Sequence, residues 1–379
     1  MAINSATTFN NLTKLSTSEK QQIKHIEMDL DVLFWDTPNS ASITAALHGC
    51  TNLESIDLSY AKLYLLPHDN LIALFKALQS CPKLEAINVH YNHLHHLDLL
   101  SLSTMFNFIA SYKSLTALYL NCNGLGELDQ DSLTIIFNAL AKSQSLQELD
   151  LGDNFLNLVA STNLSNIFTA LSRCPKLNSI ALTNNYLGRM DYQQLSAIFN
   201  CIASSQSIQN IDLSYNLLSK LSKPLLWGFG IYLQKINNLK SLELNCNQLS
   251  KVDTYNLAKF FTNLKKSVSL RSISLEHNGL DKLNLNFFAR SYITKIIGIP
   301  VIPKLTKVLT DNNRRMQAEH DAFIHTACHK QDLPQDLVGV VRSFMPYLPS
   351  YKQHTKQIVE RRKLLTRKYQ RQSTQLTKR

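Results

Sequence analysis

Two groups of histidines are the side chains in this sequence whose spacing best suits metal chemistry. One group is His90, His93, His95 and His96, and the other is His320, His325, Cys328 and His329. The last two histidines are four residues apart and would share a helical face, a spacing that zinc sites use. Neither group has a Cys pair or a carboxylate at motif spacing. We therefore expect solvated or structural histidines, with no bound metal and no other cofactor.

Catalytic motifs are absent from the sequence. It contains no glycine-rich phosphate loop, no nucleophile elbow and no kinase signature. A ligase of the cysteine type would need a reactive thiol in the C-terminal region, where Cys328 is the single cysteine. The roughly one hundred residues around it are too few for such a catalytic domain. We expect a non-enzymatic protein, since an enzyme would have to use Cys328 or one of the histidine groups.

A repeated string, Leu-x-x-Leu-x-Leu-x-x-Asn-x-Leu, organises most of the chain. Copies start at Leu53, Leu84, Leu115, Leu146, Leu177, Ile208, Leu239 and Leu270, in steps of 31 residues, and a weaker copy starts at Ile23. Within a copy, alternating apolar residues such as Leu149 and Leu151 predict a strand. In the second half of the unit, four apolar residues at helical spacing, as at Leu195, Ile198, Phe199 and Ile202, predict an amphipathic helix.

The period and the pattern together resemble leucine-rich repeats of the ribonuclease-inhibitor-like subclass. The resemblance covers about 270 of the 379 residues. It implies an α/β solenoid, a horseshoe with parallel strands on the concave face and helices on the convex face. We expect an N-terminal cap at 1–22, a solenoid of about nine 31-residue units at 23–284, a helical C-terminal module at 285–349 and a basic helical tail at 350–379.

One unit departs from the others in its helical half. Gly230 stands where the other units have Phe, and Trp227 and Gly228 lie beside it. Two glycines weaken a helix by about 1 kcal/mol each. We interpret this departure as an ordinary variation or as an adaptation to a neighbouring unit or partner.

An asparagine slot follows the strand in most units. It holds Asn92, Asn123, Asn154, Asn185, Asn216, Asn247 and Asn278, whereas Asp31 and Ala61 occupy it in the first two units. The chain turns sharply after the strand, and a buried amide can supply hydrogen-bond partners to the backbone there. In the resembling family these side chains form a ladder between repeats. We expect the same structural ladder and no catalytic role.

The outward-facing strand residues contain nine acids and no Lys or Arg. We call this surface the trough. Its candidate partner-binding residues are Asp57, Tyr60, Tyr91, Tyr119, Glu148, Asp150, Asp153, Asp212, Tyr215, Glu243 and Glu276. Solenoids bind on this face, and acids with interspersed aromatics suit a basic protein or peptide. The alternative is a merely solvated face. Nucleic acid is not expected there, because phosphates would meet like charge.

The net charge of +11 is concentrated at the C-terminus. Residues 350–379 carry ten Lys or Arg against one Glu, and ten minus one gives +9. This tail could be a nuclear-import signal, a contact to an anionic membrane or to RNA, or a competitor for the protein's own trough. The alternative is a solvated charge run.

Cysteine usage and hydropathy indicate the compartment. The seven cysteines are scattered, which indicates free thiols in a reducing environment. We identify no secretory signal and no run of about 18 apolar residues that could form a transmembrane segment. We therefore expect a soluble protein.

Two further resemblances concern function. The Asn- and Lys-rich composition and the short second module resemble, in style, the repeat-bearing effectors that intracellular bacteria such as Legionella inject into host cells. That resemblance implies a protein secreted by a specialised system, acting on a host protein in the host cytoplasm, or in the nucleus if the tail directs import. Residues 333–346 resemble the opening of an F-box, which implies, as an alternative, a substrate adaptor for ubiquitin ligation. The closing Trp of that motif has no match, and a plain helix beginning with Pro334 explains the same residues.

Overall fold

The computed structural model describes residues 6–27, 40–264 and 266–280. All the described residues belong to one compact unit. The predicted module at 285–349, the tail, the F-box-like segment, Cys328 and the second histidine group lie outside the described residues.

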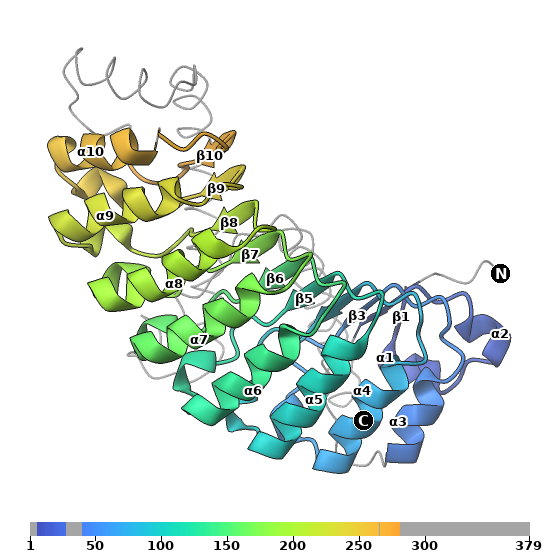
Figure 1. Cartoon of the computed structure of the whole chain (residues 1–379). Coiled ribbons are helices and arrows are strands. Elements are labelled where there is room, and N and C mark those ends of the chain that lie inside the picture. Colours follow the sequence, from blue (N-terminus) through green and yellow to red (C-terminus); the bar gives the residue numbers. More distant parts are fainter. Residues whose placement is uncertain (1–5, 28–39, 265, 281–379) are drawn as a thin grey trace, which may run out of the picture. The chain divides into compact units, whose positions relative to one another are not determined.

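Ten parallel strands form one sheet within the described part of the chain, in the order of the sequence (Figure 1). They are β1 Ala6–Thr8, β2 His25–Glu27, β3 Ser55–Asp57, β4 Ala86–Asn88, β5 Ala117–Tyr119, β6 Glu148–Asp150, β7 Ser179–Ala181, β8 Asn210–Asp212, β9 Ser241–Glu243 and β10 Ser272–Ser274. From β3 onward, paired residues are 31 positions apart, as in the pair Glu148 and Ser179. This constant register confirms the predicted repeat solenoid.

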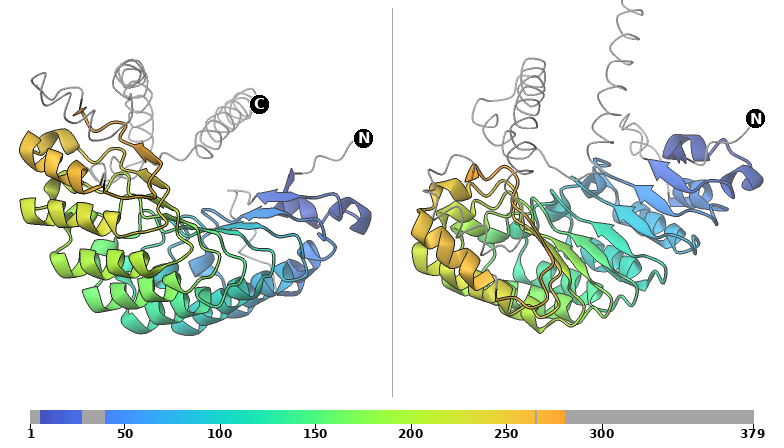
Figure 2. Two further views of the ribbon diagram at one scale, coloured as in Figure 1. Left: turned by 45° about the horizontal axis from the view of Figure 1, so that its top comes forward. Right: turned by 90° about the horizontal axis from the view of Figure 1, so that it is seen from above.

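Helices return the chain from each strand to the next. They are α1 Phe9–Leu12, α2 Thr17–Lys20, α3 Ser40–Leu47, α4 His68–Leu78, α5 Leu99–Ser111, α6 Gln130–Leu140, α7 Ser161–Ser172, α8 Tyr192–Ser204, α9 Lys223–Gln234 and α10 Thr254–Leu264. Within the described part of the chain, helices α3 to α10 cover the outer face of the sheet and the strands line the inner face (Figure 2). None of the helices in the described ranges is long and apolar enough to cross a membrane.

A short 3-10 turn joins most strands to the following helix. These turns are η2 Leu63–Leu65, η3 Leu94–His96, η4 Leu125–Glu127, η5 Leu156–Leu158, η6 Leu187–Arg189, η7 Leu218–Lys220 and η8 Leu249–Lys251. Each turn lies against the next one along the solenoid. We call the border of the sheet that they form the rim.

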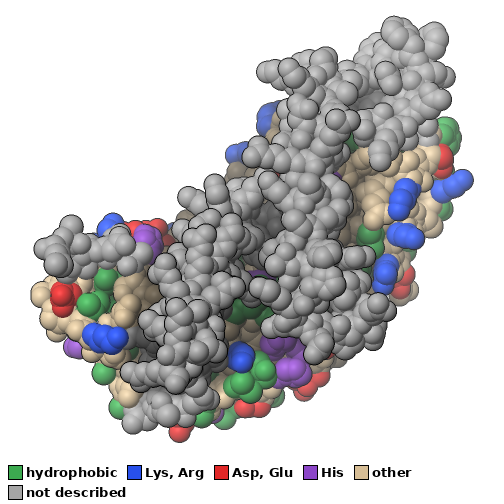
Figure 3. Space-filling model, turned by 180° about the vertical axis from the view of Figure 1, so that it is seen from behind, with side chains coloured by type: hydrophobic (Ala, Val, Ile, Leu, Met, Phe, Trp, Pro, Cys, Tyr) green, Lys and Arg blue, Asp and Glu red, His purple; other side chains and the backbone are tan. Residues whose placement is uncertain are grey.

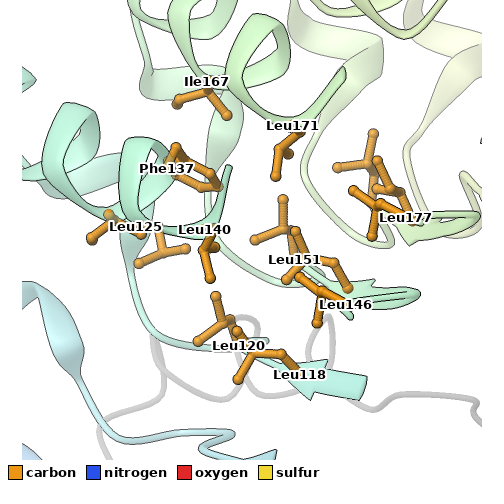
Figure 4. Close-up of a cluster of buried hydrophobic side chains, with 14 of the residues drawn as sticks. Leu118, Leu120, Leu125, Phe137, Leu140, Leu146, Leu151, Ile167, Leu171 and Leu177 are labelled. Atoms are coloured by element: carbon orange, nitrogen blue, oxygen red, sulfur yellow. The ribbon is translucent and has the colours of Figure 1, made fainter. Parts of the chain in front are cut away.

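The core lies between the sheet and the helices. In Figure 4, Leu118 and Leu120 of one unit point toward Leu140 on α6, and Leu146 and Leu151 belong to the next unit. These side chains are fully or almost fully buried. Each inward Leu removed from water stabilises the fold by about 1.5–3 kcal/mol. Because this layer continues from unit to unit, stacked repeats build one continuous core.

The sheet begins one strand earlier than the repeated string indicates. β1 pairs in parallel with β2, Ala6 opposite His25 and Thr8 opposite Glu27. Its sequence of Ala and Thr lacks the Leu pattern, so the string could not reveal it. The following helix α2 begins with a capping box, in which Ser16 N donates to Glu19 Oε2 at 2.7 Å and Ser16 Oγ accepts from Glu19 N.

In the repeat that contains α9, the aromatic core residue stands one position earlier than in the other repeats. Phe229 fills the core of α9, with its ring centroid 4.9 Å from that of Phe199. A Cβ built at Gly230 would lie 2.9 Å from Phe260 O of α10, so glycine permits a close approach of the two helices there. The adaptation is therefore to the neighbouring unit.

Candidate functional site: the strand face and its rim

The asparagine side chains link each repeat to the one before it. Asn154 Oδ1 accepts hydrogen bonds from Asn123 N at 3.0 Å and Leu125 N at 3.2 Å, and its Nδ2 donates to Leu120 O at 3.0 Å. Asn92, Asn123, Asn185, Asn216, Asn247 and Asn278 make equivalent bonds. All seven side chains are buried. The amides thus satisfy backbone groups that the turn leaves unpaired.

The backbone on both sides of each asparagine is left-handed. The preceding column includes Tyr60, Tyr91 and Asp153, and the following column includes Phe155 and Tyr186, all with φ between +53° and +59°. Non-glycine residues in this conformation cost about 1–2 kcal/mol each. The amide ladder offsets that cost, and the turn has the same conformation in each unit. Residues of one column therefore lie in line along the strand face or along the rim.

Several trough acids complete the turn that follows their strand. Asp150 Oδ1 accepts from Gly152 N at 2.8 Å, and Asp57 and Asp212 accept in the same way from Ser59 N and Ser214 N. Asn88 fills this position in β4 and accepts from His90 N. An Asx side chain at this position stabilises the turn locally. Part of the acidity of these columns therefore has a structural cause.

Asp150 and Asp153 lie below the surface of the trough, with 5% and 4% of their area exposed. Burial raises the pKa of Asp150 to about 7, against the hydrogen bond from Gly152 N, and Asp212 raises it further. Burial also raises the pKa of Asp153 to about 7, while Asn184, which donates to its carboxylate, opposes that shift. Near neutral pH both groups therefore carry only part of their charge.

The exposed acids gather toward the C-terminal strands. Glu148, Glu243 and Glu276 are exposed, and Asp212 is half-buried. Desolvation raises the pKa of Glu243, and the neighbouring carboxylates of Asp212 and Glu276 raise it further. Carboxylates of the two flanking repeats are thus close enough to Glu243 to disfavour its ionised form. No ion pair involves any of these four acids within the described part of the chain.

The tyrosines of the trough lie in two places. Tyr60 and Tyr91 stack with ring centroids 4.8 Å apart, and 44% of Tyr91 is exposed. Tyr119 is half-buried beside the acids, and its pKa is raised by burial first and then by Glu148 and Asp150. Tyr215, also half-buried, follows β8. The structure therefore places the stacked tyrosine pair in the N-terminal part of the trough, and most of its acids, with Tyr119 and Tyr215 among them, farther along the chain.

The first histidine group lies beside the stacked tyrosines. His90 Nδ1 lies 3.1 Å from Asn121 O and its Nε2 lies 3.2 Å from Tyr60 Oη, while His95 Nδ1 lies 3.0 Å from Asn123 O. The pKa of His93 is lowered by burial and then by His95 and His96. Ring nitrogens engaged in this way orient the rings toward backbone and tyrosine. Over the described ranges, no cluster of three or more His, Cys, Asp or Glu could hold a metal ion.

The six cysteines of the described residues are free thiols. Burial raises the pKa of Cys81 to about 12 and that of Cys174 to about 11. Cys122, next to Asp153, and Cys246 have pKa values raised by burial as well. The thiolate is the nucleophilic form. These shifts keep it unpopulated at neutral pH, so these cysteines suit packing rather than catalysis.

The rim carries basic residues that the pattern of the strand face does not include. Arg189, Lys220 and Lys251 are the last residues of η6, η7 and η8, and all three are exposed. They are 31 positions apart, so aligning the units beyond the asparagine slot would have revealed them. Figure 3 shows Lys and Arg side chains following one another along one border of the visible face, and histidines gathered elsewhere on it.

Comparison with solved structures supports the fold. The chain is similar to the leucine-rich repeat-containing protein LegL7 from Legionella pneumophila, with 17% identity and a TM-score of 0.51 over 79% of this chain and 99% of that one. It is also similar to TLR13 in a complex with ssRNA13, with 18% identity and a TM-score of 0.40 over 74% of this chain and 36% of that one. No family model and no curated protein matches the sequence.

Proposed function

We propose that the protein is a non-enzymatic recognition module whose trough holds a basic segment of a partner protein. One observation carries the proposal: the carboxylates of Asp212 and Glu276, from the two flanking repeats, disfavour the ionised form of Glu243, and no ion pair neutralises any of the three in the described part of the chain. A Lys or Arg side chain of a partner would relieve that repulsion. Electrostatic complementarity of this kind gives specificity and a fast association rate.

The aromatic part of the trough supports the same assignment. The exposed face of Tyr91, stacked on Tyr60, offers a rigid surface to which an Arg guanidinium can bind by cation–π contact. Tyrosine is also enriched among the residues that dominate interface energies. A basic segment lying along the trough would therefore contact carboxylates in the C-terminal half of the trough and the stacked tyrosines in the N-terminal half.

We also propose that the chain is a bacterial effector acting on a host protein. Its support is the resemblance in composition and organisation described above, and a solenoid fold shared with a Legionella protein is compatible with it. A translocation assay tests this point separately from binding. The chain is fused to a reporter enzyme that needs a host-cell cofactor and is expressed in Legionella, and the signal should disappear in a strain without its specialised secretion system.

Binding to the trough is tested with a labelled peptide of about twelve residues that alternates Arg and Gly, by fluorescence anisotropy with the full chain. The variant carries Glu148→Lys, Glu243→Lys and Glu276→Lys, because these acids are exposed and their reversal should spare the fold. At about 0.7 kcal/mol for each exposed charge, the expected loss of affinity is about 30-fold. Reversal at Asp150 is avoided because that side chain is buried.

The matched control reverses three exposed acids outside the trough, Asp69→Lys, Glu85→Lys and Asp131→Lys. It changes the net charge of the protein by the same amount. If both variants lose affinity equally, the peptide responds to net charge and the trough is not its site. If neither loses affinity, the acids of the strand face are only a solvated surface, and the proposal is wrong.

A further inference from the structure

We infer that the rim between η5 and η8 is a second binding surface, and that it takes single-stranded nucleic acid. The inference is independent of the proposed function of the trough, because it rests on other side chains. Its elements are a row of basic residues, Arg189, Lys220 and Lys251, and a pair of parallel aromatic rings, Phe155 and Tyr186. Proteins that bind single strands combine such groups, with cations along the backbone and rings under the bases.

The basic row is held in register by backbone hydrogen bonds between successive rim turns. Gly188 N donates to Asn216 O at 2.8 Å, Ser219 N to Asn247 O at 3.3 Å and Ser250 N to Asn278 O at 3.0 Å. Each donor directly precedes one of the basic residues. The three cations therefore project from equivalent positions of three adjacent turns, and a chain of phosphates can follow them without reordering the backbone.

The aromatic pair adjoins the basic row. The rings of Phe155 and Tyr186 are almost parallel, with an angle of 6° and centroids 6.1 Å apart. The guanidinium carbon of Arg189 lies 5.0 Å from the centroid of Tyr186. Both rings are half-exposed and belong to the left-handed residues that immediately precede η5 and η6. A ring face next to a guanidinium is a stacking platform for a base whose phosphate the cation can hold.

The charges of the rim favour a polyanion. In the described residues, none of the three cations forms an ion pair. The two nearby acids, Asp191 and Asp253, cap α8 and α10, where they accept from Gln194 N at 2.8 Å and Asn256 N at 3.0 Å. Asp253 also lies 3.9 Å from Lys223. Their charge is therefore partly offset by helix N-termini and a lysine.

A second basic column differs from the rim, because the position of its cations at helix ends accounts for them. Lys142, Arg173 and Lys235 also occupy one repeat position and are exposed. They stand at the C-terminal ends of α6, α7 and α9, where the helix dipole favours cations. The short rim turns offer no comparable dipole. An acidic peptide could also meet the rim cations, but it would make no use of the parallel rings, so the rings favour nucleobases.

The test measures binding of labelled single-stranded RNA and DNA oligonucleotides of about twelve residues to the full chain, by anisotropy over a range of salt concentrations. The rim variant carries Arg189→Gln, Lys220→Gln and Lys251→Gln. The control carries Lys142→Gln, Arg173→Gln and Lys235→Gln, which removes the same one Arg and two Lys from the other column. The basic tail is present in both, so its contribution cancels in the comparison.

The rim variant should bind more weakly than the control, and the slope of log K against log salt should become shallower by about 2, from three phosphate contacts at about 0.7 each. Phe155→Leu with Tyr186→Leu should lower affinity by at least about 5-fold, since stacking contributes about 1–3 kcal/mol per base. Tyr192→Leu, at an exposed ring on α8, should leave it unchanged. Thermal unfolding checks that each variant folds.

Three outcomes would overturn the inference. Equal affinity of the rim and control variants would assign binding to the tail or to diffuse charge. An unchanged affinity of the ring variant would remove the stacking platform, and with it the assignment to single strands. Equal or tighter binding of a polyglutamate peptide or of anionic lipid vesicles, lost in the rim variant, would assign the cations to another polyanion.

Discussion

At the residue scale, the asparagine slot shows how far a repeated sequence can be interpreted physically. Each amide joins three elements that the string already places in sequence: a strand, a tight turn and the same turn of the preceding unit. Asn154 therefore has its two acceptor contacts and its donor contact fixed by the repeat alone. Its role could be predicted because it depends on spacing, which the sequence contains.

Substitution of Asn154 by Ala tests this role. The change leaves Asn123 N and Leu125 N buried without a partner and removes one of the two amide donors to Leu120 O, so the free energy of unfolding should fall by about 2–4 kcal/mol. Chemical denaturation followed by circular dichroism measures it. The control is Asn107→Ala on α5, an exposed side chain bonded only to Ser103 Oγ, which should change stability little. A free energy of unfolding equal to that of the unchanged protein would contradict the ladder.

The depth of burial of individual trough acids could not be predicted in this way. Repeat position assigns Asp150, Asp212 and Glu243 to one column, yet the first is buried, the second is half-buried and the third is exposed. The difference depends on the surroundings that neighbouring units supply, as where Tyr119 of the preceding unit lies close enough to Asp150 for the carboxylate to raise its pKa. Repeat position therefore determines the face to which a residue belongs, but not the charge that it carries at neutral pH.

At the element scale, helices and strands were predictable because their apolar residues recur at fixed spacing. The strand β1 was not, since Thr7 and its neighbours form a strand by pairing with β2 rather than by an apolar pattern. The helix α9 was partly predictable. Its two glycines signalled an irregularity, but only the packing shows that Gly230 faces α10 closely whereas Gly228 has no atom within 4 Å of its added Cβ.

These two glycines should respond in opposite directions to the same substitution. Gly228→Ala should raise the free energy of unfolding by about 0.5–1 kcal/mol, because alanine restricts the unfolded chain and the helix has room for its Cβ. Gly230→Ala should lower it by about 1–3 kcal/mol, because the new Cβ would overlap Phe260 O and displace α10. Urea denaturation of the two variants measures both values. Equal shifts would show that α9 and α10 are not in close contact.

At the scale of the whole molecule, opposite charges are kept on separate surfaces of one rigid stack. The trough has acids and no Lys or Arg, the described rim between η6 and η8 ends in cations, and the tail carries most of the net charge. A solenoid allows this separation because every column is an independent surface line. Basic and polyanionic ligands could then bind the same chain at once, provided that the trough remains ionised.

Ionisation of the trough makes binding of the Arg–Gly peptide depend on pH. The pKa values of Asp150 and Asp153 are raised to about 7, and those of Asp212 and Glu243 are raised too. As the pH falls from about 8 to about 6, these groups take up protons and the trough loses negative charge. A cationic peptide favours the ionised form, so its binding should release protons. If binding requires the ionised form of one carboxyl with a pKa of about 7, the affinity should fall about 10-fold as the pH falls over that range.

Anisotropy at constant ionic strength measures the affinity, and calorimetry in two buffers of different ionisation enthalpy measures the protons released. Arginine keeps its charge throughout, so the peptide itself adds no pH dependence. Protonation of His93 would also weaken binding of the peptide as the pH falls. The double variant Asp150→Asn, Asp153→Asn separates this effect from that of the carboxyls. Its affinity should depend less on pH if the carboxyls are responsible. Proton uptake on binding, or equal affinity at both pH values, would contradict an acidic trough, because a basic ligand cannot leave ionisable carboxyls beside it unperturbed.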